Sequence, residues 1–224
     1  MKHAFTLGRP LAWRCALTAL SAAALLAPLS GCAPLVVGAA VGGTVLVATD
    51  RRTSGAQLED QAIELKAANR LREQLGERGR INVTSFNRRV LLTGEIASEA
   101  DRQTALRVVQ GVENVVAVVD ELAVMGSPSL SARSADALLT ARVKAALVDA
   151  KDLQANAFKV VTERGTVYLM GLVTQREADR AAEVVRTVPG VQRVVRVFEI
   201  ISEADLARLQ PPPPPQNTSA TPPQ

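Results

Sequence analysis

The sequence predicts an α+β protein made of two tandem copies of one small αββαβ domain. A nearly repeated phrase is the first observation: VLLTGEIASEADR begins at Val90, and VYLMGLVTQREADR begins at Val167. In both halves, moreover, apolar residues alternate over short stretches, as in strands, and then recur at helical spacing. We therefore expect each copy to hold a three-stranded sheet packed by two helices.

The first 31 residues predict an export signal. A short apolar run from 16 to 27 follows three basic residues, Lys2, Arg9 and Arg14, and it is too short to span a bilayer as a finished helix. The next letters, LSGC at 29–32, resemble the bacterial lipobox, which implies that Cys32 is lipidated and residues 1–31 are removed. Ala33 follows that cysteine. Similar lipoproteins that stay in the inner membrane carry Asp at this position, so Ala33 implies sorting to the outer membrane. An ordinary signal with a chance cysteine is the alternative.

Processing limits the chemistry of the mature chain. The whole chain carries a net charge of +4, and residues 1–31 hold three positive charges and no acid, so about +1 remains. An exported, nearly neutral chain is not expected to bind nucleic acid. The one histidine, His3, and the one other cysteine, Cys15, both lie in the signal. We expect no disulfide, metal site or cofactor, because disulfides, zinc sites and Ser-His-Asp or Cys-His triads need those residues. Carboxylate-only or Ser-Lys catalysis stays formally open, but no spacing indicates it, so we expect no catalytic group.

The expected organisation has six parts. The signal (1–31) precedes a lipidated N-terminus and flexible tether (32–55), domain one (56–125), a linker (126–133), domain two with a short C-terminal helix (134–209) and a proline-rich tail (210–224). Gly38 and Gly42 form a GxxxG pattern, which can pack helices within a membrane. The run is short and lacks flanking anchors, so we favour a tether.

The elements of domain one are expected in a definite order. A helix over 58–75 precedes strands over 81–86 and 88–94, which a turn at Asn87 joins. Ser98 then caps a helix that Gly111 closes, and 112–124 forms the last strand.

Domain two repeats this order. A helix over 138–148 precedes strands over 158–163 and 166–171 around a turn at Arg164–Gly165. Thr174 and Glu177 form a capping box for a helix ending near Pro189–Gly190. A strand over 191–200 and a short helix over 202–210 complete the domain.

Four glycines are expected to be structural. Gly94 matches Gly171 at an offset of 77, EADR at 99 matches EADR at 177 at 78, and Gly111 matches Gly190 at 79. The drift predicts single-residue loop insertions. We place Gly94 and Gly171 where a strand ends and a missing side chain permits close approach, which we favour over ligand binding.

Both copies resemble the BON domain, whose pattern is a strand ending in glycine, a capped helix and then GV-x-x-V. Here the pattern reads VLLTG with GVENV, and VYLMG with GVQRV, over about 56–200. With the lipobox and the TDRRTSG stretch, the chain resembles the dual BON-domain outer-membrane lipoproteins, the division- and outer-membrane-stress-associated lipid-binding protein family. The resemblance implies a periplasm-facing lipoprotein that binds anionic phospholipid, such as phosphatidylglycerol or cardiolipin, through its second domain. It also implies roles in division and envelope integrity, and an association with the outer-membrane protein assembly machinery.

The residues themselves also favour domain two. Residues 56–124 hold 9 basic and 11 acidic side chains, whereas 130–200 hold 11 and 8. On the helix over 138–148, the expected core face comprises Leu139, Val143, Ala146 and Leu147. We therefore expect an interfacial surface formed by Leu138, Ala141, Arg142 and Ala145, with Lys144 and Arg133 nearby. The alternatives are that Leu138 packs against domain one, or that this surface binds a protein.

Overall fold

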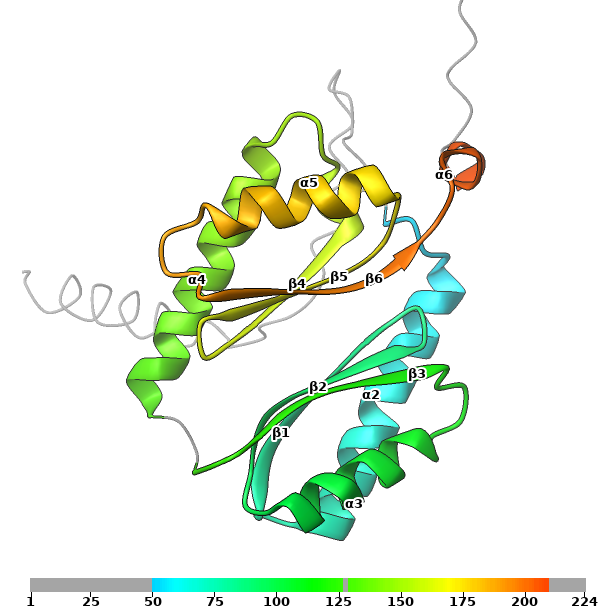
Figure 1. Ribbon diagram of the computed structural model, residues 1–224. Coiled ribbons are helices and arrows are strands. Elements are labelled where there is room, and N and C mark those ends of the chain that lie inside the picture. Colours follow the sequence, from blue (N-terminus) through cyan, green and yellow to red (C-terminus); the bar gives the residue numbers. More distant parts are fainter. Residues whose placement is uncertain (1–49, 127–128, 210–224) are drawn as a thin grey trace, which may run out of the picture. The chain divides into compact units, whose positions relative to one another are not determined.

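A computed structural model describes residues 50–126 and 129–209, which all belong to one compact unit (Figure 1). The predicted signal, the lipidation of Cys32, most of the tether and the proline-rich tail lie outside these residues. No helix within the described ranges is both long and apolar enough to cross a membrane.

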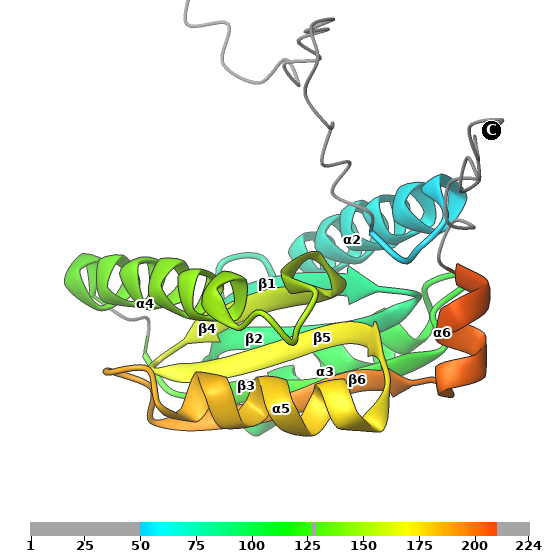
Figure 2. The same ribbon diagram turned by 90° about the horizontal axis from the view of Figure 1, so that it is seen from above.

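Each domain has the predicted αββαβ order. Domain one consists of α2 (Ser54–Leu75), β1 (Gly79–Phe86), β2 (Arg89–Ile96), α3 (Glu99–Gln110) and β3 (Ala117–Val124). Domain two consists of α4 (Leu130–Asp149), the 3₁₀ turn η1 (Ala155–Ala157), β4 (Phe158–Glu163), β5 (Thr166–Val173), α5 (Gln175–Arg186) and β6 (Arg193–Ile200), followed by α6 (Glu203–Leu209). The middle strand of each sheet pairs antiparallel with the first strand and parallel with the third. Both helices of a domain lie on one face of its sheet (Figures 1 and 2).

The helix-covered faces hold the predicted cores. Val90 and Leu92 are buried against α2 and α3, and Val167 and Leu169 are buried against α4 and α5. The predicted stripe on α5, formed by Ala178, Ala181, Ala182 and Val185, is also buried. Alternation along the strands and helical spacing thus identified these faces correctly.

The opposite face of each sheet is also buried, which alternation alone does not predict. A third apolar cluster joins side chains of both domains: Phe86, Leu91, Tyr168, Met170 and Val197. The continuous apolar runs VLL and VYLM are typical of strands buried on both faces. The two sheets therefore cover each other's second face.

Ion pairs between the domains surround this third cluster. Arg80 of β1 pairs with the buried Glu163, and Arg164 pairs with the buried Glu95 at 2.6 Å. Burial raises the pKa of Glu163, and the charge of Arg80 opposes that rise. Similar pairs join Lys159 to Glu64 at 2.9 Å and Arg193 to Glu121 at 2.5 Å. Because they involve several elements of each domain, they fix the register of the two sheets.

An aspartate on the first helix holds the hairpin of each domain. Asp60 on α2 accepts hydrogen bonds from the backbone N–H groups of Asn87 and Arg88, at 2.7 and 2.8 Å. Asp136 on α4 accepts from Arg164 and Gly165 at 2.8 and 2.9 Å. This repeated contact aligns the two first helices at an offset of 76 residues.

The sequence predicts that the offset between the two copies rises from 77 to 79 residues, and this is wrong beyond the second strand of each sheet. The caps Ser98 and Thr174 are confirmed, and they are 76 residues apart, as are the bounds of α3 and α5 and of β3 and β6. Asp101, and not Glu99, therefore takes the place of Glu177. The matching letters EADR mislead because one residue fewer separates β5 from its following helix.

The four glycines differ in what they do. Gly94 and Gly171 lie inside β2 and β5 and not at strand ends, yet close approach is confirmed. A Cβ at Gly94 would lie 1.9 Å from the carbonyl oxygen of Arg80, at a φ of +115°, and one at Gly171 would lie 2.5 Å from that of Ala157. Gly190 has a φ of 99° and corresponds to Asn114, with a φ of 67°. Gly111 caps α3 at a φ of −84°, which any residue can adopt.

Two boundaries of the predicted linkers are wrong. α4 begins at Leu130 after its cap Ser129, so Arg133 is helical and does not belong to a linker. α2 begins at Ser54 after its cap Thr53. Upstream of it, Arg51 and Arg52 are fixed by buried carboxylates: Arg51 pairs with Glu177 at 2.7 Å, and Arg52 pairs with Asp60 at 2.6 Å. The folded body therefore includes residues 50–55, which an unpatterned polar stretch does not reveal.

We expect Gly94→Ala to lower the free energy of unfolding by about 3 kcal/mol or more, because the new Cβ meets a carbonyl oxygen at a strained φ. Urea unfolding of the chain from residue 33 onward measures this change. Gly111→Ala is the matched control, since its Cβ would make only ordinary contacts. Equal stability of the two variants would contradict the close-approach role of Gly94.

We expect Glu177→Gln to cost about 3 kcal/mol at pH 7, since it leaves the buried Arg51 without its carboxylate. Burial opposes ionisation of Glu177, but hydrogen bonds from Arg51 and from the Thr174 backbone hold its pKa below the usual range. A lowered pKa stabilises the fold above the pKa of the unfolded chain, and that stability is lost as the pH falls through the folded value. The difference between wild type and variant should therefore shrink below about pH 4 in unfolding curves. A difference that stays constant to pH 2.5 would refute this role.

Candidate functional site

The helix α4 packs on its sheet along one stripe. Leu139, Val143 and Leu147 are buried, and Ala146 packs beside them, as predicted. These residues recur at three- and four-residue spacing, so the opposite side of the helix points away from the core.

That opposite side is apolar in its centre. At about 100° per residue, Leu138, Ala141 and Ala145 lie within an arc of about 60°. Leu138 is 61% exposed, so it does not pack against domain one. Leu130 and Val148, 73% and 63% exposed, extend the same strip toward the two ends of the helix.

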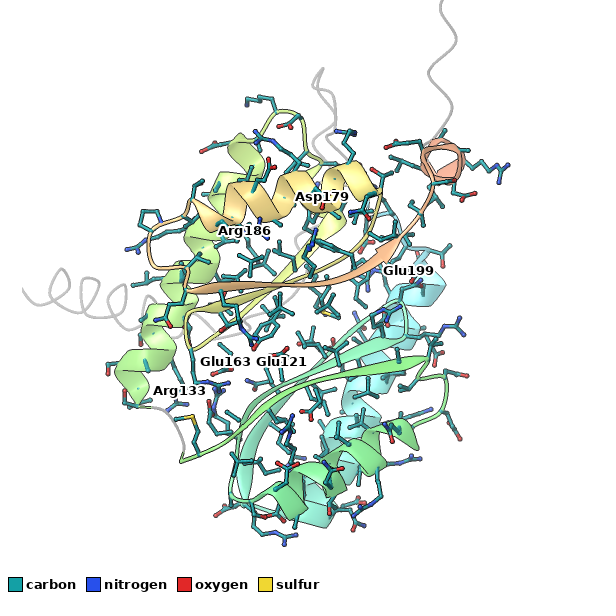
Figure 3. The ribbon with its side chains drawn as sticks, in the orientation of Figure 1. Glu121, Arg133, Glu163, Asp179, Arg186 and Glu199 are labelled. Carbon is teal, nitrogen blue, oxygen red and sulfur yellow. The ribbon has the colours of Figure 1, made fainter. Side chains whose placement is uncertain are left out.

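Three exposed cations flank the strip. Arg142 lies along one edge, and Arg133 and Lys144 lie along the other, on the helical positions that 100° steps assign them. Figure 3 labels Arg133 on the N-terminal half of α4. None of the three takes part in a salt bridge with another described residue. We call this surface the α4 face: Leu130, Ala137, Leu138, Ala141, Ala145 and Val148 with Arg133, Arg142 and Lys144.

The sequence prediction found most of the α4 face but not all of it. It misses Leu130 and Ala137, because the expected helix begins at 138. It also misses Val148, which lies at the end of the expected helix, one turn beyond Ala145. Ser129, whose side chain accepts from the Ala132 N–H, is the signal that could have placed the true start.

The equivalent helix of domain one differs at the decisive position. Lys66 on α2 corresponds to Arg142 at the offset of 76, and Lys66 pairs with Glu113 at 2.8 Å. The residue that corresponds to Glu113 is Pro189, which carries no charge. Domain one thus neutralises its cation, whereas domain two leaves the corresponding arginine open to an anion.

An open hollow of about 470 Å³ adjoins the α4 face. Arg142, Asp136 and Leu139 line it from α4, and Arg164, Gly165, Gly190 and Gln192 line it from two loops. Arg164 is already paired with Glu95 at 2.6 Å, which leaves Arg142 as the cation of this hollow that pairs with no described residue.

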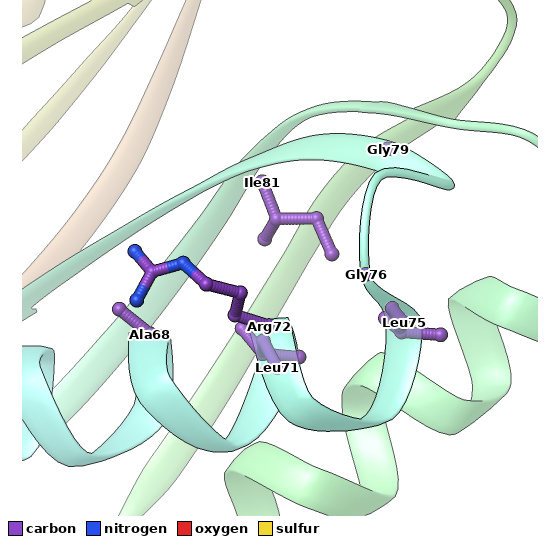
Figure 4. A pocket seen from close by; sticks show the side chains of 7 residues that line it. All are labelled: Ala68, Leu71, Arg72, Leu75, Gly76, Gly79 and Ile81. Carbon is purple, nitrogen blue, oxygen red and sulfur yellow. The ribbon is translucent and has the colours of Figure 1, made fainter.

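The hollow between α2 and β1 of domain one is much smaller, at about 130 Å³ (Figure 4). Arg72 lines it together with Leu71, Leu75 and Ile81. In domain two the position of Arg72 is taken by the exposed Val148, and the corresponding hollow measures about 390 Å³. Lys144 takes the place of Ala68 in the same hollow, so the hollow of domain two is the larger one and each hollow carries one cation of the first helix.

No cluster of His, Cys, Asp and Glu suitable for a metal ion occurs among the residues that the structure describes.

The architecture defines a tandem αββαβ protein, and comparison with known families agrees. Residues 59–126 and 135–202 both match the family model described as the BON domain. The chain belongs to the BON-domain family, as one of the dual-domain outer-membrane lipoproteins.

Three relatives show the extent of the similarity. The chain is 38% identical over 177 residues to the outer membrane lipoprotein DolP of Haemophilus influenzae. The aligned residues cover 77% of this chain and 90% of that protein. It is 33% identical over 154 residues to the 21 kDa hemolysin of Actinobacillus pleuropneumoniae, covering 68% and 79%. It is 33% identical over 117 residues to the osmotically-inducible protein Y of Escherichia coli, covering 51% and 58%.

Proposed function

We propose that this protein is a non-enzymatic lipoprotein, held in the outer membrane by acyl chains on Cys32 and facing the periplasm. Its second domain docks on anionic phospholipid, such as phosphatidylglycerol or cardiolipin, through the α4 face. In this role it supports envelope integrity, including at division sites. The observation that carries the proposal is the exposed apolar strip of α4 between cations that make no salt bridge with any described residue.

The physics of an interfacial helix supports the proposal. Such a helix lies at the boundary between headgroups and acyl chains, with apolar residues toward the chains and cations toward the headgroups. Each cation near an anionic leaflet contributes about 1 kcal/mol, so the three together provide about 3 kcal/mol. That is weak binding for a free domain. An acylated Cys32 would make it nearly intramolecular and therefore effective.

A second candidate function is a protein adaptor, for example for the outer-membrane protein assembly machinery. Leu58 and Leu65 of α2 favour it, because they are 68% and 64% exposed and lie two helical turns apart on one side of the helix. Lipid docking depends on charge and weakens in salt, whereas an apolar protein interface does not.

We expect the unlipidated chain from residue 33 to float with vesicles containing phosphatidylglycerol or cardiolipin, and not with phosphatidylethanolamine mixtures of low charge. Arg142→Glu should weaken binding about 30-fold, because reversing one charge changes the attraction by about 2 kcal/mol. Leu138→Glu should also abolish flotation at the same lipid concentration. The matched control is Lys66→Glu on α2, which should float like wild type. Flotation that survives both α4 variants would favour the adaptor.

We expect Pro189→Glu to weaken vesicle binding about five-fold, because it recreates beside Arg142 the carboxylate that pairs with Lys66 in domain one. Pro189→Gln is the matched control, with the same shape and no charge, and it should bind like wild type. Vesicle titrations at low salt measure both. If the two variants bind equally, the open charge of Arg142 does not contribute to lipid docking.

A further inference from the structure

Two neighbouring arginines upstream of α2 contact different domains. The side chain of Arg51 reaches domain two, while that of Arg52 reaches domain one. Their side chains are only 6% and 12% exposed. The lipid-docking function proposed above uses neither of them.

Arg51 is held by domain two through four contacts. Its Nη2 and Nη1 donate to the two carboxylate oxygens of Glu177 at 2.7 and 2.8 Å, a bidentate pair. Nη1 also donates to the carbonyl oxygen of Leu172 at 2.9 Å, and Nη2 donates to Gln154 at 3.1 Å. Glu177 in turn completes the capping box of α5. Arg51 is therefore tied to a rigid part of domain two.

Arg52 is held by domain one in a similar way. Its Nη1 donates to Asp60 at 2.6 Å, and its guanidinium carbon lies 4.0 Å from the ring centre of Phe86. Asp60 also accepts from Ser85 at 2.6 Å and holds the β1–β2 turn. Asp50 accepts from the other side of the Arg52 guanidinium at 2.7 Å. Removing one partner from such a buried pair is costly, because the other charge is left unpaired.

The position of this pair along the chain gives it a consequence for the membrane anchor. The segment that carries Cys32 joins the folded body at Asp50, and 18 residues can span at most about 60 Å. Asp50 lines the hollow of about 390 Å³ in domain two together with Lys144, Leu147 and Val148. Asp50, the first described residue, therefore lies beside α4 of domain two, although the next helix along the chain belongs to domain one.

We propose that Arg51 and Arg52 form an arginine clamp that fastens the anchor-bearing segment to both domains and holds the α4 face toward the membrane. Arg51 is the positioning residue, because it alone of the two joins the segment to domain two. The orientation of the α4 face toward the membrane rests on the lipid docking proposed above. The fastening by Arg51 and Arg52 can be measured without lipid.

The first test uses the mature lipoprotein in neutral detergent micelles, with spin labels at Thr49→Cys, directly upstream of the clamp, and at Lys151→Cys of domain two. Lys151 is exposed, and an acylated Cys32 carries no free thiol. Wild type should give one narrow distance distribution by electron–electron double resonance. Arg51→Ala should broaden it at least two-fold, and Arg51→Lys should recover part of the order. An unchanged width in Arg51→Ala overturns the clamp, whether or not the protein binds lipid.

The second test asks whether the clamp positions the α4 face. A fluorophore at Ser134→Cys, on the exposed side of α4, is quenched by nitroxide lipids in phosphatidylglycerol vesicles that carry the anchored protein. Arg51→Ala should lower the quenching at least two-fold, while the unlipidated variant still floats like wild type. Arg72→Ala, an exposed arginine of α2, is the matched control and should change neither readout. Equal quenching in wild type and Arg51→Ala contradicts the positioning role. If the unlipidated wild-type chain does not float with phosphatidylglycerol vesicles, the lipid docking itself is contradicted.

Discussion

The structure depends on one constraint: each three-stranded sheet is apolar on both faces, but its own two helices cover only one. The middle strands alternate between the helix-covered cores and the cluster that contains Leu91, Tyr168 and Met170. A lone domain would expose that second face to water, at a cost of about 25 cal/mol for each Å². The tandem arrangement removes the cost, because each sheet buries the second face of the other. The helices are thereby left on the outside, where α4 can meet a partner.

Duplication also lets the two copies diverge where the core does not constrain them. Both first helices keep the aspartate that holds the hairpin, Asp60 and Asp136, and both keep their buried stripes. Their outer sides differ. Domain one pairs Lys66 with Glu113, whereas domain two has Pro189 at the corresponding position and leaves Arg142 open. A single exchange in a loop is thus sufficient to give one copy an open positive charge.

Much of the fold could be predicted from the sequence, because strand alternation, helical spacing and the caps Ser98 and Thr174 are local signals. The α4 side chains could be placed on an exposed surface for the same reason. Non-local contacts could not be predicted. The burial of Arg51 depends on Glu177, which lies 126 residues away. The helical start of α4, in contrast, is marked by a local cap, Ser129. The letters EADR predict the wrong repeat offset, because they occupy different helical positions in the two copies.

The central claim is that the α4 face, and not the equivalent side of α2, meets anionic lipid. The most direct measurement is a residue-resolved NMR titration of the unlipidated chain with bicelles containing phosphatidylglycerol. The predicted result is that the largest shift changes fall on α4 between Leu130 and Val148 and weaken in high salt. Changes centred on Leu58 and Leu65 of α2, or changes insensitive to salt, would contradict it.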